Sequence, residues 1–506
     1  MTEMPASAPP RPGASPLARN VAFTTVGTTL SNVCLYLSNW AIVRYYTPDL
    51  HGTVAWLVGV VVLSMMLTDL GLATKGSVRR IARSRAGRDD LDEAVSTLMT
   101  VPTLLATVAA VLVALAVAST IGQRPGVTGW AAVLTAAWIG CLAVERVGQT
   151  LATGLQRMGW TLAMRPVAEG AKLAWVVVCW LAGLDFLWLL IGWTVAYALS
   201  AAMAVLSAVV LSRRFRFHPR VRLTSLGKTL GTLGGTLPYY LPQLWLMGMP
   251  MAMRLVIGSH WPAEMISVFQ VFWSLAAVSR LAALPISQSI FPMIAEADGR
   301  GDGHLGTAQV LRSSVRMLGW VSTSLLAGLW AFGPWLLPAL YGPVAGPMYV
   351  EHLTGLLLLI IAVGIENVSI LLDQVLMATS AALLARVELG KMALMAVAVV
   401  VAVPAGGVLG AAAAYLAVAV AATGVKLVLT QRRIDASGAG ALAATLVTFL
   451  ATAAAGLAVG RWWAILPTAL VAGIASGLMR RRDLRLWART GWRVVTSVTG
   501  VRPGRV

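Results

Sequence analysis

The chain has 506 residues, of which 58% are hydrophobic and only 12% are charged, and its formal net charge is +19. This composition excludes an ordinary water-soluble globular protein of the same length. It does not favour nucleic-acid binding either, since the basic loops are short and carry no aromatic-interleaved recognition module. Membrane insertion beside anionic lipid accounts for the excess of Lys and Arg.

Apolar runs dominate the chain after a Pro-rich start. Residues 1–18 contain no apolar run of the kind found in a signal peptide, so we predict a disordered cytoplasmic tail there. Beyond it we count about fourteen runs of about 20 apolar residues, each long enough to cross a bilayer as a helix. The sequence therefore predicts an all-α integral membrane protein. The runs lie at 20–43, 52–74, 95–121, 127–148, 166–182, 186–211, 231–253, 263–290, 313–332, 354–378, 384–403, 407–429, 438–459 and 462–478.

Positive charge falls on alternate loops. If both termini share one side, 28 of the 39 Lys and Arg residues lie in the loops and tails of that side, 4 lie on the other and 7 lie within runs. The four on the sparse side are Arg44, Arg124, Arg254 and Arg461. Because cytoplasmic loops are enriched in Lys and Arg, both termini are expected in the cytoplasm, and the regular alternation supports an even number of helices.

Two halves of the chain echo each other at an offset of about 210–220 residues, as repeated halves of transporters do. We predict an N-lobe of six helices at 19–211, a cytoplasmic linker at 212–230 and a C-lobe of six helices at 231–435. A helix pair at 436–479 follows, and the two lobes are expected to flank a central cavity. The echoes are Arg44 with Arg254, Gln149 with Gln374, and Glu169-x-x-Lys172 with Glu388-x-x-Lys391.

The loops and the C-terminal tail offer little room for catalysis. The longest predicted outside loop is 333–353, and the others are shorter. The tail at 480–506 places Arg on one helical face and Trp and aliphatic residues on the other. This pattern is typical of an interfacial amphipathic helix that touches membrane lipid, and partner docking is the alternative.

The three cysteines, Cys34, Cys141 and Cys179, all lie within apolar runs. They are interpreted as small core residues and not as a disulfide set or a metal site. No phosphate-binding loop, nucleophile elbow or cluster of metal ligands is visible, so we expect no cofactor and no ATP-driven step.

Several short motifs resemble a known family. The segments are Arg19-Asn20, Arg44-Tyr-Tyr-Thr-Pro-Asp-Leu-His-Gly52, Asp69-Leu-Gly-Leu72, Arg79-Arg80, Leu340-Tyr-Gly342 and Gly407-Val-Leu-Gly-Ala-Ala-Ala413. Over roughly residues 19–433 they resemble the polysaccharide-transport branch, which includes O-antigen flippases, of the multidrug/oligosaccharidyl-lipid/polysaccharide exporter superfamily. The resemblance implies a bacterial cytoplasmic-membrane transporter. His51 departs from the family's usual Tyr, and Arg254 stands near where many relatives carry an acid.

Ionisable residues inside the runs are candidates for the transport site, because each costs about 2.5–3.5 kcal/mol near a helix centre if it faces lipid. The candidates for binding an anionic head group are Arg44, Lys172, Arg254 and Arg280. Lys172 can instead pair with Glu169 one turn away, and Arg280 can instead pair with Glu366 or Asp373. Glu145 and Arg146 are expected to snorkel or pair locally near a helix end.

The candidate acids fall into two sets. Glu366 and Asp373 are two helical turns apart and share a face, so they are candidates for H⁺ or Na⁺ coupling, with a buried hydrogen-bonded pair as the alternative. Asp69 and Glu169 are interpreted as gating or structural residues, and Asp69 is expected to pair with the basic stretch that follows it.

The first run carries a polar stripe that suits a cavity touching sugar hydroxyls, with interhelical hydrogen bonding as the alternative. Its members are Thr25, Thr28, Thr29, Asn32, Tyr36 and Asn39. The seventh run contains Pro238, Pro242 and Pro250, which are expected to kink it.

These features lead to three functional hypotheses. The leading one is a flippase for a polyprenyl-pyrophosphate-linked oligosaccharide, whose anionic head group suits a cationic cavity. It expects membrane lipid and polysaccharide assembly proteins as partners, and no nucleic acid. The alternative is a cation-coupled multidrug antiporter of the same superfamily. A polytopic glycan polymerase or ligase is the third, and the short outer loops disfavour an enzyme.

Overall fold

A computed structural model of the protein describes residues 16–69, 77–78, 81, 91–155, 157–218, 240–280, 283 and 305–431. The predicted helix pair at 436–479 and tail at 480–506 lie outside these residues, as do most of the tail at 1–18 and the linker after residue 218. The elements that the described residues form are all helices, as predicted.

The first helix group comprises α1 to α7. Its members are α1 (Pro16–Tyr45), α2 (Pro48–Asp69), α4 (Leu91–Ala118), α5 (Gly129–Gly154), α6 (Met158–Ala182) and α7 (Phe186–Phe215). Local sequence sets the turn between α6 and α7: Gly183 ends α6 at φ +64°, and the Asp185 carboxylate accepts hydrogen bonds from the first N–H groups of α7. The predicted start of the fifth run at Pro166 is wrong, because α6 begins at Met158 and carries Pro166 inside it.

The second helix group comprises η1 to α14. Its members are η1 (Leu244–Gly248), α9 (Met249–His260), α10 (Ala263–Ala277), α12 (Leu305–Glu351), α13 (Leu353–Thr379) and α14 (Ala381–Gln431). Two of these are pairs of helices joined at a glycine with positive φ. Gly342 breaks α12 at φ 88°, and Gly407 breaks α14 at φ 52°.

The predicted outside loop at 333–353 is wrong. α12 continues through Pro334 and Pro338, and a short second segment follows Gly342 up to Glu351. Pro343 stands in the first turn after the break at Gly342, where a missing N–H costs no hydrogen bond.

Seven helical segments among the described residues are long and apolar enough to span a membrane. Each coincides with one or two of the predicted runs, and the Gly407 break separates the runs at 384–403 and 407–429. The predicted total of fourteen includes runs that fall outside the described residues. Large apolar side chains are exposed on the outward faces, for example Leu181 at 79% and Leu115 at 63%, as expected where the surrounding solvent is lipid.

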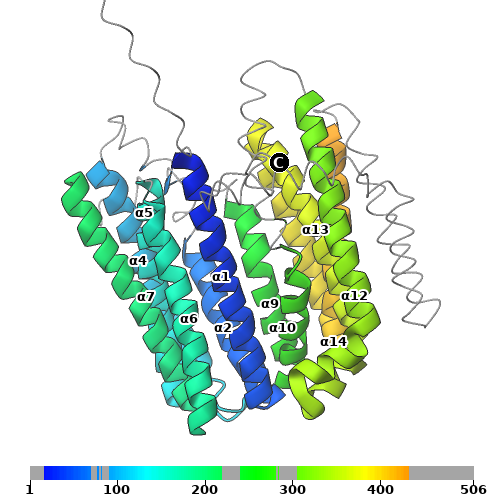
Figure 1. The fold of residues 1–506 in the computed structure, drawn as a ribbon. Helices are drawn as coiled ribbons and strands as arrows, with labels where there is room; N and C mark the ends of the chain where they lie inside the picture. The colour runs from blue at the N-terminus through cyan, green and yellow to red at the C-terminus, as the bar shows by residue number, and fades with distance from the viewer. Residues whose placement is uncertain are drawn as a thin grey trace, which may run out of the picture.

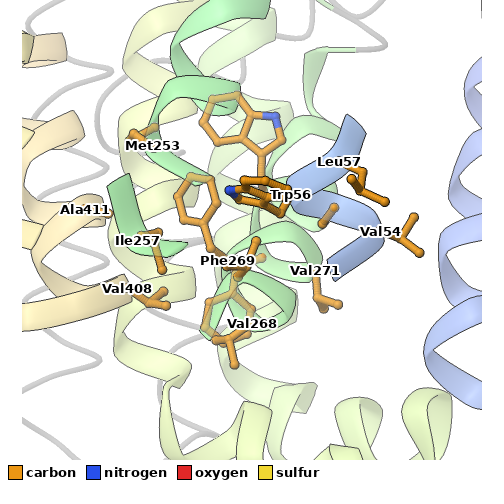
Figure 2. Packing of buried hydrophobic residues seen from close by; sticks show 14 of the residues in the cluster. Val54, Trp56, Leu57, Met253, Ile257, Val268, Phe269, Val271, Val408 and Ala411 are labelled. Carbon is orange, nitrogen blue, oxygen red and sulfur yellow. The ribbon is translucent and has the colours of Figure 1, made fainter. Parts of the chain in front are cut away.

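The helices lie side by side (Figure 1). We call the side where α1 begins the proximal side, and the side where α1 ends the distal side; the proximal side is uppermost in Figure 1. One apolar core joins the two helix groups. Figure 2 shows Trp56 of α2 and Phe269 of α10 near the middle of this packing, with Ile257 of α9 and Val54 of α2 on opposite sides.

Gly52 marks a close approach of the two groups. A Cβ built on Gly52 would collide with the backbone carbonyl of Ala263 at the start of α10. We expect Gly52→Ala to push α2 from α10 and to lower the midpoint of thermal unfolding in detergent by several °C. Gly140→Ala in α5 is the matched control, since nothing lies within 4 Å of its added Cβ, and helix propensity should make it neutral or stabilising. Equal midpoints for the two variants would contradict the close packing.

Candidate functional site

Six charged side chains form a cluster inside the second helix group. We call them the six-charge cluster, and none is more than 8% exposed. Its members are Arg280, Glu366, Asp373, Glu388, Lys391 and Lys426. Three cations face three carboxylates, so the cluster is neutral when every member is ionised.

Ion pairs connect the whole cluster. Arg280 pairs with Glu366, and Lys391 Nζ lies 3.7 Å from Glu366 Oε1 and 3.3 Å from Glu388 Oε2. Lys426 pairs with Glu388 and lies 2.6 Å from Asp373 Oδ1. Buried charges persist only when each is compensated in this way, since an isolated ion inside a protein carries a large desolvation cost.

Aromatic side chains enclose the Glu366 end of the cluster. Trp245 and Tyr415 both donate hydrogen bonds to Glu366, and Arg280 Nη2 lies 3.1 Å from the Tyr415 hydroxyl. Lys391 Nζ stands 3.9 Å from the centroid of the Trp245 ring. These cation–π and hydrogen-bonding contacts hold the charges in fixed positions.

A π-helical turn adjoins the cluster. Pro250 has no N–H to donate to the carbonyl of Leu246, four residues earlier, and the intervening turn, η1, is a π-helix. Arg280 Nη1 approaches the Leu246 carbonyl at 3.5 Å. The kink that the prolines of this run predict stays a prediction: Pro250 lies in the first turn of α9 directly after the π-helical turn, and Pro238 lies outside the described residues.

The structure brings together three of the residues singled out by sequence. Glu366 and Asp373 lie in the same cluster, as their spacing predicts, but each is paired with a cation. Arg280 adopts the pairing alternative, with Glu366 as its partner. A role of Glu366 and Asp373 in ion coupling remains a prediction.

A smaller charged site lies in the first helix group. We call it the first-half site; it comprises Glu145, Glu169, Lys172 and Tyr197. Lys172 Nζ lies 3.0 Å from Glu169 Oε1, which is the predicted one-turn pair, and stands 3.8 Å from the Tyr197 ring centroid. Gln149 Nε2 donates to Glu145 Oε1 at 2.6 Å.

Glu145 does not snorkel. It is only 6% exposed, because α5 continues to Gly154 and leaves Glu145 about 13 Å from the helix end. Arg146, the next residue, does pair locally: its Nη1 lies 3.2 Å from Asp69 Oδ2 on α2. The basic stretch expected to pair with Asp69 lies largely outside the described residues.

The two sites share the Glu-x-x-Lys spacing seen in the sequence. Both copies of the motif form buried ion pairs, Glu169 with Lys172 and Glu388 with Lys391, while the repeat of two whole lobes stays a prediction. Further matches follow at offsets of 218–221 residues. They are Glu145 with Glu366 and Tyr197 with Tyr415. Aligning the halves on Glu-x-x-Lys would have revealed both matches in the sequence.

Arg254 differs from the other buried cations. It is 3% exposed, its Nε has no hydrogen-bond partner, and no described acid lies within ion-pair distance of it. Its Cβ lies against the bare face of Gly59 on α2, at the junction of the two helix groups. The prediction that Arg254 ends its helix is wrong, because α9 continues to His260.

A polar relay lies close to Arg254 on the distal side. His51 is within electrostatic range of Arg254, and its Nδ1 lies 2.7 Å from Ser267 Oγ on α10. Ser267 Oγ in turn lies 2.9 Å from the hydroxyl of Tyr349, after the Gly342 break. His51 Nε2 has no partner among the described residues, so this junction is polar but incompletely satisfied.

Other contacts close the distal side. Trp40 Nε1 donates to the Leu340 carbonyl at 2.8 Å, and Arg124 Nη2 donates to the Gly258 carbonyl at 2.5 Å. Burial lowers the pKa of the Arg124 guanidinium. Arg44 is exposed and packs beside Gly342, so it is not gathered with Lys172, Arg254 or Arg280.

Part of the α1 stripe faces the second helix group. Asn32, Tyr36 and Asn39 are half-buried, and Tyr36 lies within electrostatic range of Arg280. The side chains of Thr25 and Thr28 lie outside the described residues. The sequence prediction of a cavity-lining face therefore stays a prediction for the whole stripe.

Comparison with solved structures finds transporters. The lipid II flippase MurJ in an inward closed conformation matches with a TM-score of 0.68 at 10% identity, over 91% of this chain and 99% of that chain. An inward-facing multidrug resistance MATE family transporter of the MOP superfamily matches at 0.60 and 14% identity, over 83% and 98%. An outward-facing MATE structure matches at 0.54 and 13% identity, over 85% and 99%. No protein-family model matches the sequence, and a search of curated proteins finds no relative.

The protein is thus an all-helical, multi-pass membrane protein with the fold of MOP-superfamily transporters. Its structural neighbours are transporters and not enzymes. The superfamily-level resemblance is therefore confirmed at the level of fold.

Proposed function

We propose that the protein is a flippase that moves a polyprenyl-pyrophosphate-linked oligosaccharide across a bacterial cytoplasmic membrane by alternating access. One structural neighbour is a flippase for lipid II, so the fold is compatible with a lipid-linked saccharide. In this proposal the polyprenyl tail remains in the bilayer while the head group passes between the two helix groups.

Arg254 is the observation that carries this proposal. Of the four candidate head-group residues, Lys172 and Arg280 already have carboxylate partners, and Arg44 is exposed on the distal side. Arg254 is buried at the junction of the helix groups without a described acidic partner. A guanidinium in this state favours a phosphate or pyrophosphate as its counter-ion.

The charge distribution supports an orientation. The basic side of the sequence coincides with the proximal side, which we assign to the cytoplasm together with both termini. The distal contacts through Trp40, His51 and Arg124 then form the outer gate. They must separate when the head group leaves, while the half-buried α1 stripe contacts the sugar. The polysaccharide assembly proteins predicted from the resemblance would meet the emerging saccharide here.

Reconstitution into proteoliposomes tests this function. We expect the purified protein to move a fluorescent polyprenyl-pyrophosphate-linked saccharide between leaflets, measured as its exposure to a membrane-impermeant quencher. Empty liposomes, and liposomes with the distal gate cross-linked, are the controls. Absence of movement both with and without an ion gradient would exclude the flippase.

The alternative is a cation-coupled multidrug antiporter, which the similarity to MATE-family structures supports. Gradient-driven efflux of a cationic dye by the same proteoliposomes, lost on Asp373→Asn, would favour it over the flippase.

A further inference from the structure

We propose that the first helix group holds one exchangeable monovalent cation, either H⁺ or Na⁺, between the carboxylates of Glu145 and Glu169. This inference deepens the proposed function, because it assigns ion coupling to the half of the protein where the sequence did not place it. Only the role of the ion in transport rests on the proposed function; the presence of the cation site does not.

The first observation is a difference in charge between the two repeated sites. The six-charge cluster balances three carboxylates with three cations. The first-half site has two carboxylates, Glu145 and Glu169, and one ammonium group, that of Lys172. Among the described residues, one of these two negative charges is therefore not matched by a buried cation, and a single bound cation would neutralise it.

The second observation is an orphan oxygen. Glu169 Oε1 pairs with Lys172, but Glu169 Oε2 has no hydrogen-bond partner among the described residues, although the residue is only 9% exposed. In the other half, the matching Glu388 gives one oxygen to Lys391 and the other to Lys426. Glu169 Oε2 thus corresponds to the Glu388 oxygen that pairs with the Lys426 ammonium group in the second half.

The first-half site has no counterpart of Lys426, because the sequence differs at the matching position. Matching Tyr197 with Tyr415 places Ala208 opposite Lys426, and matching Glu145 with Glu366 places Ala152 opposite Asp373. The Asp–Lys pair of the second half is therefore replaced by two alanines. Glu145 also lacks the guanidinium that Arg280 supplies to Glu366, and its described hydrogen-bond partners are the neutral side chains of Gln149 and Ser200.

One further cation lies near Glu145. On α6, Glu169, Lys172 and Arg165 are all within electrostatic range of it, but Arg165 is exposed to the surroundings, so Lys172 is the buried cation of the site. Tyr197 approaches from α7. On α2, Asp69 is paired with Arg146, and α4 carries no charged residue after Glu93.

Unfolding of the purified protein in detergent tests the site without any lipid-linked substrate. The probes are NaCl against choline chloride at equal ionic strength, and pH from about 5.5 to 8.5. We expect Na⁺ to raise the unfolding midpoint by about 2–4 °C if Na⁺ is the ligand, and falling pH to do so if it is H⁺. Glu145→Gln, which removes the surplus charge, should abolish the response.

Two further variants make the result specific. Ala208→Lys imitates Lys426 and should also abolish the response while keeping the midpoint high. Glu366→Gln, the matched change in the other half, should lower the midpoint yet keep the response. If the Glu145→Gln and Ala208→Lys proteins respond like wild type, or if only Glu366→Gln loses the response, the proposal is wrong. Each of these outcomes can occur whether or not the protein proves to be a flippase.

Discussion

Lys426→Ala should be among the most destabilising single substitutions in this protein. The change leaves Asp373 without its ammonium partner and removes one of the two partners of Glu388, both inside the bundle. Removing one member of a buried ion pair costs about 3–5 kcal/mol. We expect a sharp fall in the unfolding midpoint and in the yield of monodisperse protein, measured by fluorescence-detected size exclusion in detergent.

A second substitution should restore much of this loss. Asp373→Ala/Lys426→Ala removes both charges and reproduces the alanine pair that the first half carries as Ala152 and Ala208. Glu388 keeps Lys391 as a partner at 3.3 Å, so no carboxylate is left unpaired. The double variant should therefore be more stable than Lys426→Ala alone. A double variant as unstable as the single one would show that packing, and not charge balance, sets the cost.

Arg254→Met should separate transport from stability. The guanidinium has no described acidic partner, so its removal strands no carboxylate, and methionine fills a similar apolar path between α2 and α9. We expect an unchanged or raised unfolding midpoint. Loss of a charge-assisted contact to the head group should slow translocation of the lipid-linked saccharide about ten- to hundredfold.

Arg280→Met is the matched control for this experiment. It removes a guanidinium of equal charge, but it leaves Glu366 without one of its cations, so we expect a marked fall in stability. If Arg254→Met destabilises the protein as strongly as Arg280→Met, then Arg254 has a structural partner and is not free to bind the substrate. Normal translocation by a stable Arg254→Met protein would equally contradict its role.

Composition and apolar periodicity predicted the helices well, because the cost of an unpaired backbone in lipid leaves few alternatives to a helix. They also predicted the Glu169–Lys172 pair, whose partners are one turn apart. They did not reveal how deeply each charged side chain is buried, or which distant residue it pairs with. Glu145 was expected near a helix end, and Lys426 was not among the candidate residues, whereas both are buried.

The sequence did not reveal these pairings because the paired residues are far apart along the chain. Arg280 and Glu366 are 86 positions apart, and nothing in the local sequence of either indicates which acid or base it will meet. Local sequence can also mislead: the residues around Arg254 predicted an outer loop, but α9 extends beyond Arg254. A sequence predicts the number of helices more readily than the rotation of each helix about its own axis, and this rotation decides which side chains meet.

The contact between Arg280 and the Leu246 carbonyl couples electrostatics to helix shape. Pro250 cannot donate to that carbonyl four residues earlier, and the guanidinium that approaches it also neutralises Glu366. Any event that draws Arg280 toward another anion would leave this carbonyl without its external donor, and the wide η1 turn would then be free to tighten or unwind. The shape of this helix, which lies at the junction of the two halves, would in this way depend on which anion the buried Arg280 contacts.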